Sequence, residues 1–278
     1  MRLFLLTLLA MCAFAGNSLL CRLALRHTAI DPASFTAVRV LAGALALAAI
    51  LGLRGGARRP GGNWGSALAL FTYAAAFSLA YVELAAGTGA LLLFGAVQAT
   101  MVLAGLRRGE RLVPRQLAGL ATALGGLLVL LSPGITAPAP AGAALMVAAG
   151  IAWGVYSLRA RGGGDPLAVT AGNFLRAVPL AGLLVLAMRA KLDADAAGVA
   201  YAIASGALTS GVGYAVWYAA LPGLRAASAA TVQLSVPVIT AAGGALLLAE
   251  PVTLRLLGAS AAVLGGIGLV IRGGPGVR

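Results

Sequence analysis

Two stretches of this sequence match, Asp31-Pro32-Ala33-Ser34-Phe35-Thr36-Ala37 and, 134 residues further along, Asp165-Pro166-Leu167-Ala168-Val169-Thr170-Ala171. Each stretch opens a long apolar segment of the kind that crosses a lipid bilayer. We therefore expect two copies of one unit, at residues 1–134 and 135–278. If each copy holds an odd number of membrane-spanning helices, the second copy enters the bilayer in the opposite orientation, which is an architecture found in transporters.

The composition excludes an ordinary soluble domain. Hydrophobic residues make up 61% of the chain and charged residues 10%, against roughly 45–50% and 25% in soluble proteins. The net charge of +13 does not indicate nucleic-acid binding, because the arginines lie in short loops between apolar segments. Cys12 and Cys21 fall on opposite faces of one helix, so we expect neither a disulfide nor a metal or cofactor site.

Ten segments are long and apolar enough to span a bilayer, which takes about 20 residues each. They are residues 3–25, 32–53, 65–85, 88–106, 115–132, 140–159, 167–188, 197–219, 225–247 and 255–272. The first segment also has features of a signal peptide, but the repeat requires it as a helix. The sequence therefore predicts an all-α integral membrane protein with ten transmembrane helices, arranged as two inverted five-helix repeats.

The distribution of Lys and Arg predicts the orientation in the membrane. Thirteen of the 20 lie on the side that holds both termini, and five, Arg22 among them, lie on the opposite side. The remaining two, Arg39 and Arg176, lie inside predicted helices. Cytoplasmic loops carry an excess of positive charge, so we expect a multi-pass protein of the cell inner membrane with both termini in the cytoplasm.

Several short motifs, in the order in which they occur, resemble those of a known superfamily. They are Gly16-Asn17-Ser18, Arg39, Gly109-Glu110-Arg111, the segment from Gln233 to Pro237, and Ala249-Glu250-Pro251. Together with ten helices in two repeats, they resemble the drug/metabolite transporter superfamily, and more closely its ten-helix exporters with two EamA-type repeats. Within that group the chain looks most like the aromatic amino acid exporters. The resemblance implies a central cavity inside helices one to four and six to nine, with helices five and ten at the periphery.

Two arginines inside helices are candidates for substrate binding, because a charge at membrane depth needs a partner or a task. Arg176 falls near the centre of the seventh helix, where it would pair with a substrate carboxylate or bind backbone carbonyls of a neighbouring segment. Arg39 lies nearer the start of the second helix, and a structural role at the membrane surface is favoured there.

Aromatic residues recur at helical spacing on three predicted helices. They are Tyr73, Phe77 and Tyr81 on the third helix, Trp153 and Tyr156 on the sixth, and Tyr214 and Trp217 on the eighth. Facing a cavity, these rings would stack on flat or apolar side chains and would also attract organic cations. The alternative is a belt of aromatic residues at the membrane interface.

Four amides complete the predicted substrate site: Asn17, Gln98, Asn173 and Gln233. Amides can bind a zwitterion without a proton step, and hydrogen bonds between helices are their alternative role. The one carboxylate inside a predicted helix, Glu83, lies near its end, so we expect uniport or exchange in preference to proton antiport.

These features predict an exporter of amino acids, chiefly aromatic and other large neutral ones, that works by alternating access. The alternatives are an exporter of drugs or organic cations, and a non-transporting structural or interaction protein of the membrane. No nucleophile, metal cluster or acid/base pair indicates an enzyme, and no cofactor is expected. Small residues spaced by four, Ala121/Gly125 and Ala261/Gly265, would let helices five and ten pack closely within one chain or across a homodimer.

Overall fold

The structure, a computed structural model, describes residues 1–54, 60–109, 111–134, 137–160, 164–224, 229 and 232–272. Its first half contains α1 (Arg2–His27), α2 (Pro32–Leu53), α3 (Trp64–Tyr81), α4 (Ala86–Arg107) and α5 (Pro114–Leu131). Its second half contains α6 (Pro140–Arg159), α7 (Pro166–Ala187), η1 (Arg189–Lys191), α8 (Ala196–Ala204), η2 (Ser205–Val212), α9 (Gly213–Ala220), η3 (Leu221–Gly223), α11 (Ser235–Leu248) and α12 (Leu254–Arg272). No strand occurs in these ranges.

Nine helical segments among the described residues are long and apolar enough to cross a membrane, and α11 is a shorter apolar helix. One of the nine is the continuous segment Ala196–Gly223, in which η2 is wound as a π-helix between α8 and α9. The predicted all-α membrane fold is therefore confirmed. The predicted ninth helix began at residue 225, whereas α11 begins at Ser235, and residues 225–228, 230 and 231 lie outside the described part of the chain.

The two matching stretches found in the sequence begin α2 and α7 in the same way. Asp31 accepts hydrogen bonds from the backbone N–H groups of Ala33 and Ser34, and Asp165 accepts one from that of Leu167, with Pro as the first helical residue in both cases. Burial raises the pKa of the Asp31 carboxyl, but the hydrogen bonds that it accepts, including one from Asp193 N–H, outweigh burial and lower it. Asp31 therefore also attaches the start of α2 to the segment before α8.

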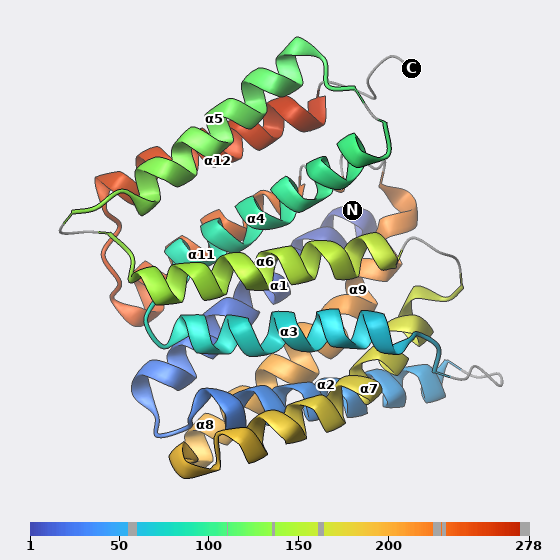
Figure 1. The fold of residues 1–278 in the computed structure, drawn as a ribbon. Coiled ribbons are helices and arrows are strands. Elements are labelled where there is room, and N and C mark those ends of the chain that lie inside the picture. The colour runs from blue at the N-terminus through green and yellow to red at the C-terminus, as the bar shows by residue number, and fades with distance from the viewer. Residues whose placement is uncertain are drawn as a thin grey trace.

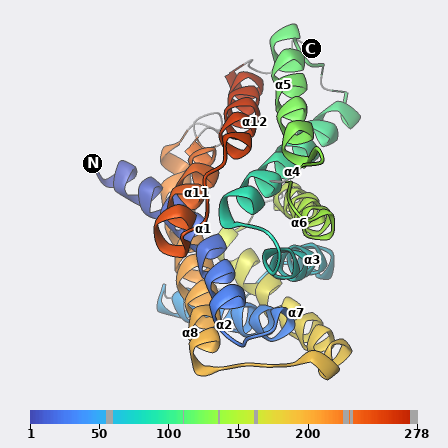
Figure 2. The same ribbon diagram turned by 90° about the vertical axis from the view of Figure 1, so that its left-hand side faces the viewer.

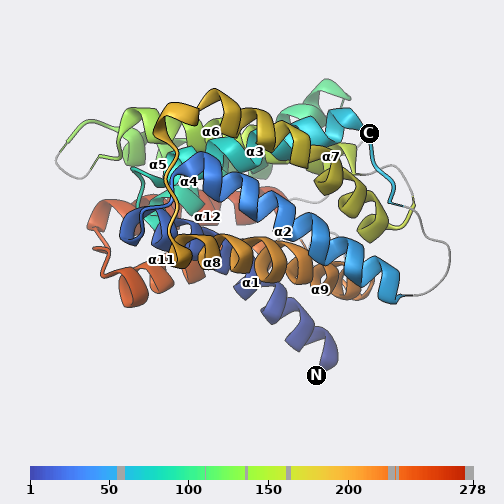
Figure 3. The same cartoon turned by 90° about the horizontal axis from the view of Figure 1, so that it is seen from below.

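Helices from the two halves of the chain interleave. Each of α1 to α5 has its most extensive packing against an element of the second half: α1 against α9 and α11, α2 against α7, α3 and α4 against α6, and α5 against α12. In Figure 2, α12, α11, α1 and α8 form one layer, and α5, α4, α6, α3 and α7 form the other. Figure 3 shows α2 between α7 and the α8–α9 segment, where it joins the layers.

The helices α5 and α12 lie together at one end of the bundle (Figure 1), which agrees with the peripheral position implied for the fifth and tenth helices. A Cβ atom at Gly119 would lie 2.5 Å from the carbonyl oxygen of Gly266, so these two backbones touch. The close packing therefore occurs within one chain. The predicted stripe of small residues does not form this contact, because Gly125 and Gly265 have nothing within 4 Å of an added Cβ and face outward; its role in a homodimer stays a prediction.

Candidate functional site

A cavity of about 490 Å³, counted with the space at its mouth, lies between α1, α3, α4, α6, η2 and α9. It is lined by Phe14, Asn17, Ser18, Tyr73, Phe77, Leu93, Phe94, Trp153, Thr209, Ser210, Tyr214 and Gln233. Helices of both halves thus contribute to one central space.

Aromatic rings form one continuous surface of this cavity. Trp153 lies at the centre of the surface, with ring centroids 4.9 Å from Tyr73 and 5.8 Å from Tyr214, and it stacks on Tyr214 at an interplanar angle of 25°. Tyr73 in turn contacts Phe77 at 5.3 Å. The rings come from α3, α6 and α9, so three helices position a surface on which a flat or apolar group can stack.

The amide of Asn17 organises the polar part of the cavity wall. Its Nδ2 donates to the hydroxyl of Tyr73 at 3.0 Å, and its Oδ1 accepts from Ser205 Oγ at 2.8 Å and from Arg39 Nη1 at 3.3 Å. Ser205 opens the π-helical segment η2, which also supplies Thr209 to the wall. A π-helical turn is often found at functional sites.

Arg39 lies directly behind this wall and is only 3% exposed. Its guanidinium carbon is 5.0 Å from the ring centroid of Phe77, 5.6 Å from that of Tyr73 and 6.0 Å from that of Phe35. Among the described residues it forms no ion pair, and Asn17 accepts its one hydrogen bond. Arg39 therefore does not extend outward to the membrane surface, because the side chain turns inward and brings a buried positive charge next to the cavity.

Arg176 occupies a different environment. Its Nη1 donates to the carbonyl oxygens of Gly61 at 2.6 Å and Gly172 at 2.9 Å, and it does not line the cavity. In the structure Arg176 binds backbone carbonyl oxygens, which is the alternative role that the sequence predicted for it. Arg176 thus attaches the segment that precedes α3 to α7.

The structure brings six of the thirteen predicted site residues to the cavity wall: Asn17, Tyr73, Phe77, Trp153, Tyr214 and Gln233. Trp217 lies near them, with its ring centroid 6.0 Å from that of Phe14. Tyr156 stacks on Trp153 from behind and accepts from Asn173, whose Oδ1 binds the N–H of Asn63.

Two further predicted residues lie away from the cavity wall. Tyr81 is fully buried, and its hydroxyl donates to the carbonyl oxygen of Ala86. Gln98 lines a separate apolar crevice between α4, α5 and α12. The prediction omitted Ser205, Thr209 and Ser210, although a cluster of hydroxyls inside an apolar helix was a usable signal.

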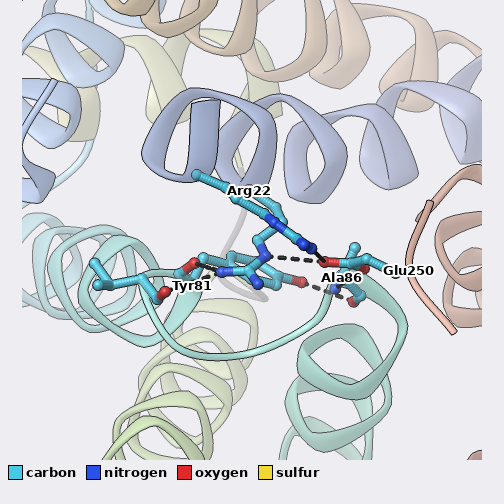
Figure 4. Close-up of polar contacts among 6 residues, drawn as sticks. Arg22, Tyr81, Ala86 and Glu250 are labelled. Carbon is cyan, nitrogen blue, oxygen red and sulfur yellow. Dashed lines mark hydrogen bonds and ion pairs between the residues drawn. The ribbon is translucent and has the colours of Figure 1, made fainter. Parts of the chain in front are cut away.

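A buried ion pair lies beyond the cavity, near the end of α1 that is opposite the N-terminus. Figure 4 shows its contacts. Arg22 Nε donates to Glu250 Oε1 at 2.9 Å, and Arg22 Nη1 donates to the carbonyl oxygens of Tyr81 and Val82 at 2.8 and 2.9 Å. Glu250 Oε2 accepts from the N–H of Ala86 at 2.7 Å. Arg22, which the sequence assigns to the side opposite the termini, lies within α1 and its side chain turns into the protein.

The burial of Glu250 contradicts the expectation that Glu83, near a helix end, is the one acid to consider within the membrane. Glu250 lies in the connection between α11 and α12 and yet is buried, so a carboxylate does occur close to the cavity. Glu83, the acid that the sequence placed in a helix end, instead accepts from the N–H of Gly142 at the start of α6. Glu110, which precedes Glu250 by 140 residues and lies at the matching place before the fifth predicted helix, is outside the described residues.

A bundle of membrane-spanning helices around a central cavity of rings and amides is the architecture of a membrane transporter. The profile of the EamA-like transporter family matches this sequence twice, over residues 1–132 and 140–272. The chain belongs to the EamA-like transporter family.

Two relatives are similar to this chain over most of its length. A protein of Pseudomonas aeruginosa named only as uncharacterized is 64% identical over 274 residues, which cover 97% of this chain and 94% of the relative. An uncharacterized transporter of Archaeoglobus fulgidus is 27% identical over 199 residues, covering 70% of this chain and 71% of the relative. A solved crystal structure superimposes with a TM-score of 0.66 at 22% identity, over 95% of this chain and 97% of the other, and shows the fold alone.

Proposed function

We propose that the protein exports amino acids with aromatic or other large neutral side chains across the cell inner membrane. The observation that carries this proposal is the composition of the cavity wall, in which stacked rings adjoin an amide that a buried arginine contacts. The rings of Trp153 and Tyr73 suit a flat or apolar side chain. Arg39 and Asn17 suit the carboxylate at the other end of the same molecule.

The polar residues and the aromatic rings act at different stages of binding. Arg39 attracts the carboxylate toward the polar part of the wall, where the carboxylate replaces Asn17 as the partner of Arg39. The Asn17 amide then still offers a donor and an acceptor to the amino-acid group of the substrate. Trp153 then stacks on the side chain and excludes water from it. Movement of the two pseudo-symmetric halves about this central site would expose it to one side of the membrane and then to the other.

Uniport or exchange is the mode of transport that we propose. The described residues of the cavity wall include amides, hydroxyls and rings but no carboxylate, so the wall itself offers no group that must gain or lose a proton near neutral pH. We further propose that both termini lie in the cytoplasm, because the loops on their side carry most of the arginines.

A rival substrate class is that of drugs and organic cations, which aromatic rings also attract. The buried charge of Arg39, 5.6 Å from the Tyr73 ring, opposes a cation in the same space. Because like charges repel strongly where little water screens them, a substrate that carries a carboxylate fits this cavity better.

Competition transport in proteoliposomes tests the proposal. Uptake of labelled phenylalanine is measured against unlabelled neutral, acidic and basic amino acids and a cationic dye, with large neutral amino acids expected to compete best. Trp153→Ala should reduce discrimination between aromatic and small amino acids. The control is Trp64→Ala, which removes the same ring from a residue that is 60% exposed at the start of α3 and should leave the profile unchanged. Competition by the dye alone would contradict the proposal.

A further inference from the structure

We propose that Arg22 and Glu250 form the outer gate of this transporter, which closes one end of the cavity and separates when the protein opens to that side. The inference rests on membership in a transporter family, on the proposed orientation with both termini in the cytoplasm and on the geometry of the pair, and it does not depend on which substrate is carried. The outer gate is defined here as Arg22, Glu250 and the backbone groups of residues 81, 82 and 86 that they bind.

The outer gate lies one helical turn beyond the cavity wall. On α1, Ser18 lines the cavity and Arg22 follows it by four residues; on α3, Phe77 lines the cavity and Tyr81 follows it by four. Four residues of α-helix advance about 6 Å. The ring of Tyr81 meets that of Phe77 edge to face at 4.7 Å, so the gate and the cavity wall are in direct contact.

The contacts of the gate join three parts of the chain across this end. Arg22 belongs to α1, its carbonyl partners belong to the end of α3, and Glu250 belongs to the α11–α12 connection and binds the first N–H of α4 (Figure 4). The cation lies at a helix C-terminus and the anion at a helix N-terminus, which is the arrangement that the helix dipoles favour. Separating the pair would therefore leave α1 bound to α3 and the α11–α12 connection bound to α4, and would remove the contact that holds these two groups of elements together.

The chemistry of the pair suits a contact that opens. A buried ion pair adds little net stability compared with apolar residues of the same volume, because both charges lose their hydration. When the gate opens, water can replace each lost partner and return that hydration. A second cation, Arg26, lies 3.6 Å from Glu250 Oε1, and its side chain is 42% exposed, so it already connects the pair to the outer surface.

Packing along α4 shows which end of the cavity is closed. Residues 86–97, next to the gate, are buried except for Thr88, whereas residues 98–104 are partly or fully exposed. The part of α4 next to the gate is therefore tightly packed. This is the arrangement expected of a transporter whose outer gate is shut.

Cysteine accessibility tests the gate without any substrate. Ser18, which lines the cavity just inside the gate, is replaced by Cys in a background that carries Cys12→Ser and Cys21→Ala. A membrane-impermeant maleimide is then applied to intact cells, and the labelling rate of Ser18→Cys is measured. Inside-out vesicles provide the opposite side, from which labelling should be faster than in intact cells.

Glu250→Gln keeps an acceptor for the Ala86 N–H but removes the charge that holds Arg22, and it should increase labelling from outside at least tenfold. The matched control is Glu83→Gln, an acid at the same end that binds α6 and takes no part in the gate; it should leave the rate within about twofold. Should Glu250→Gln fail to fold, Arg22→Lys keeps the charge but cannot bind Glu250 and both carbonyls together, and it should increase the rate severalfold.

Two results would overturn the proposal. One is an unchanged labelling rate in a gate variant that elutes as a folded monodisperse protein. The other is an equal increase in the Glu83→Gln control, which would show that any loosening of this end exposes residue 18. Neither result bears on the substrate, so failure of the gate and failure of the proposed amino-acid specificity are distinguishable.

Discussion

Replacement of Arg39 by Gln is the most direct test of how a substrate carboxylate would be held. The Arg39 guanidinium is buried, and among the described residues its charge is not matched by an acid. A hydrogen bond between charged groups contributes about 1.5–3 kcal/mol, and ~1.4 kcal/mol corresponds to a tenfold change in affinity. Arg39→Gln should therefore weaken the binding of a neutral amino acid by about 10- to 150-fold.

The assay compares two inhibitors of counterflow in proteoliposomes, phenylalanine and phenethylamine, which has the same ring and no carboxylate. In the unsubstituted protein phenylalanine should inhibit much more strongly. In Arg39→Gln the ratio of the two inhibition constants should approach one, because only phenylalanine loses a partner. A ratio that the substitution leaves unchanged would refute the assignment of the carboxylate to Arg39.

Arg176→Gln is the matched control for this experiment. It removes a partly buried guanidinium from α7 that binds the carbonyl oxygens of Gly61 and Gly172 and does not line the cavity. It should lower the thermal stability of the protein and leave the ratio of inhibition constants unchanged. A change of that ratio in Arg176→Gln alone would indicate that Arg176, on α7, binds the substrate carboxylate instead.

Two further predictions concern stability. Gly126→Ala places a Cβ 2.8 Å from that of Ala262 and should cost about 1–3 kcal/mol through overpacking, whereas Gly125→Ala meets nothing within 4 Å and should be neutral; thermal unfolding in detergent compares the two. Asp31 has a lowered pKa in the folded protein, so its carboxylate stabilises the fold above the usual aspartate pKa of about 3.9 and loses that effect as the pH falls through the folded value. Asp31→Asn should lower stability at pH 7 and flatten the acid limb of the stability profile, and an unaltered limb would contradict this.

The sequence predicted a helix well where the residues of that segment alone determine its ends. The second helix was predicted at residues 32–53 and is found at Pro32–Leu53, because an aspartate cap and a proline determine its start. The π-helical segment η2 was not predicted, since an extra residue in a helical turn leaves the apolar composition unchanged. Hydropathy therefore located the membrane segments but not the local winding that brings Thr209 to the cavity.

The candidate site was predicted less completely because it depends on contacts between distant residues. Arg22 and Glu250 are 228 residues apart, and each taken alone resembles a charge at a helix end. The depth of a residue along its helix also failed to predict which of Arg39 and Arg176 lies next to the cavity. Which of the two meets the cavity depends on the direction of each side chain around its helix, and that direction is decided by the neighbouring helices.

The pairing of α5 with α12 has a consequence for the order in which the protein is made. Leu131 ends α5 and Leu254 begins α12, so roughly 120 residues must be synthesised before α5 meets its partner. At about 5–20 residues per second, the interval is on the order of 6–25 s. During that time the small-residue face of α5 around Gly119 faces lipid or the insertion machinery. Assembly of this pair thus requires insertion of the last helix, and a chain truncated before α12 would leave this face uncovered.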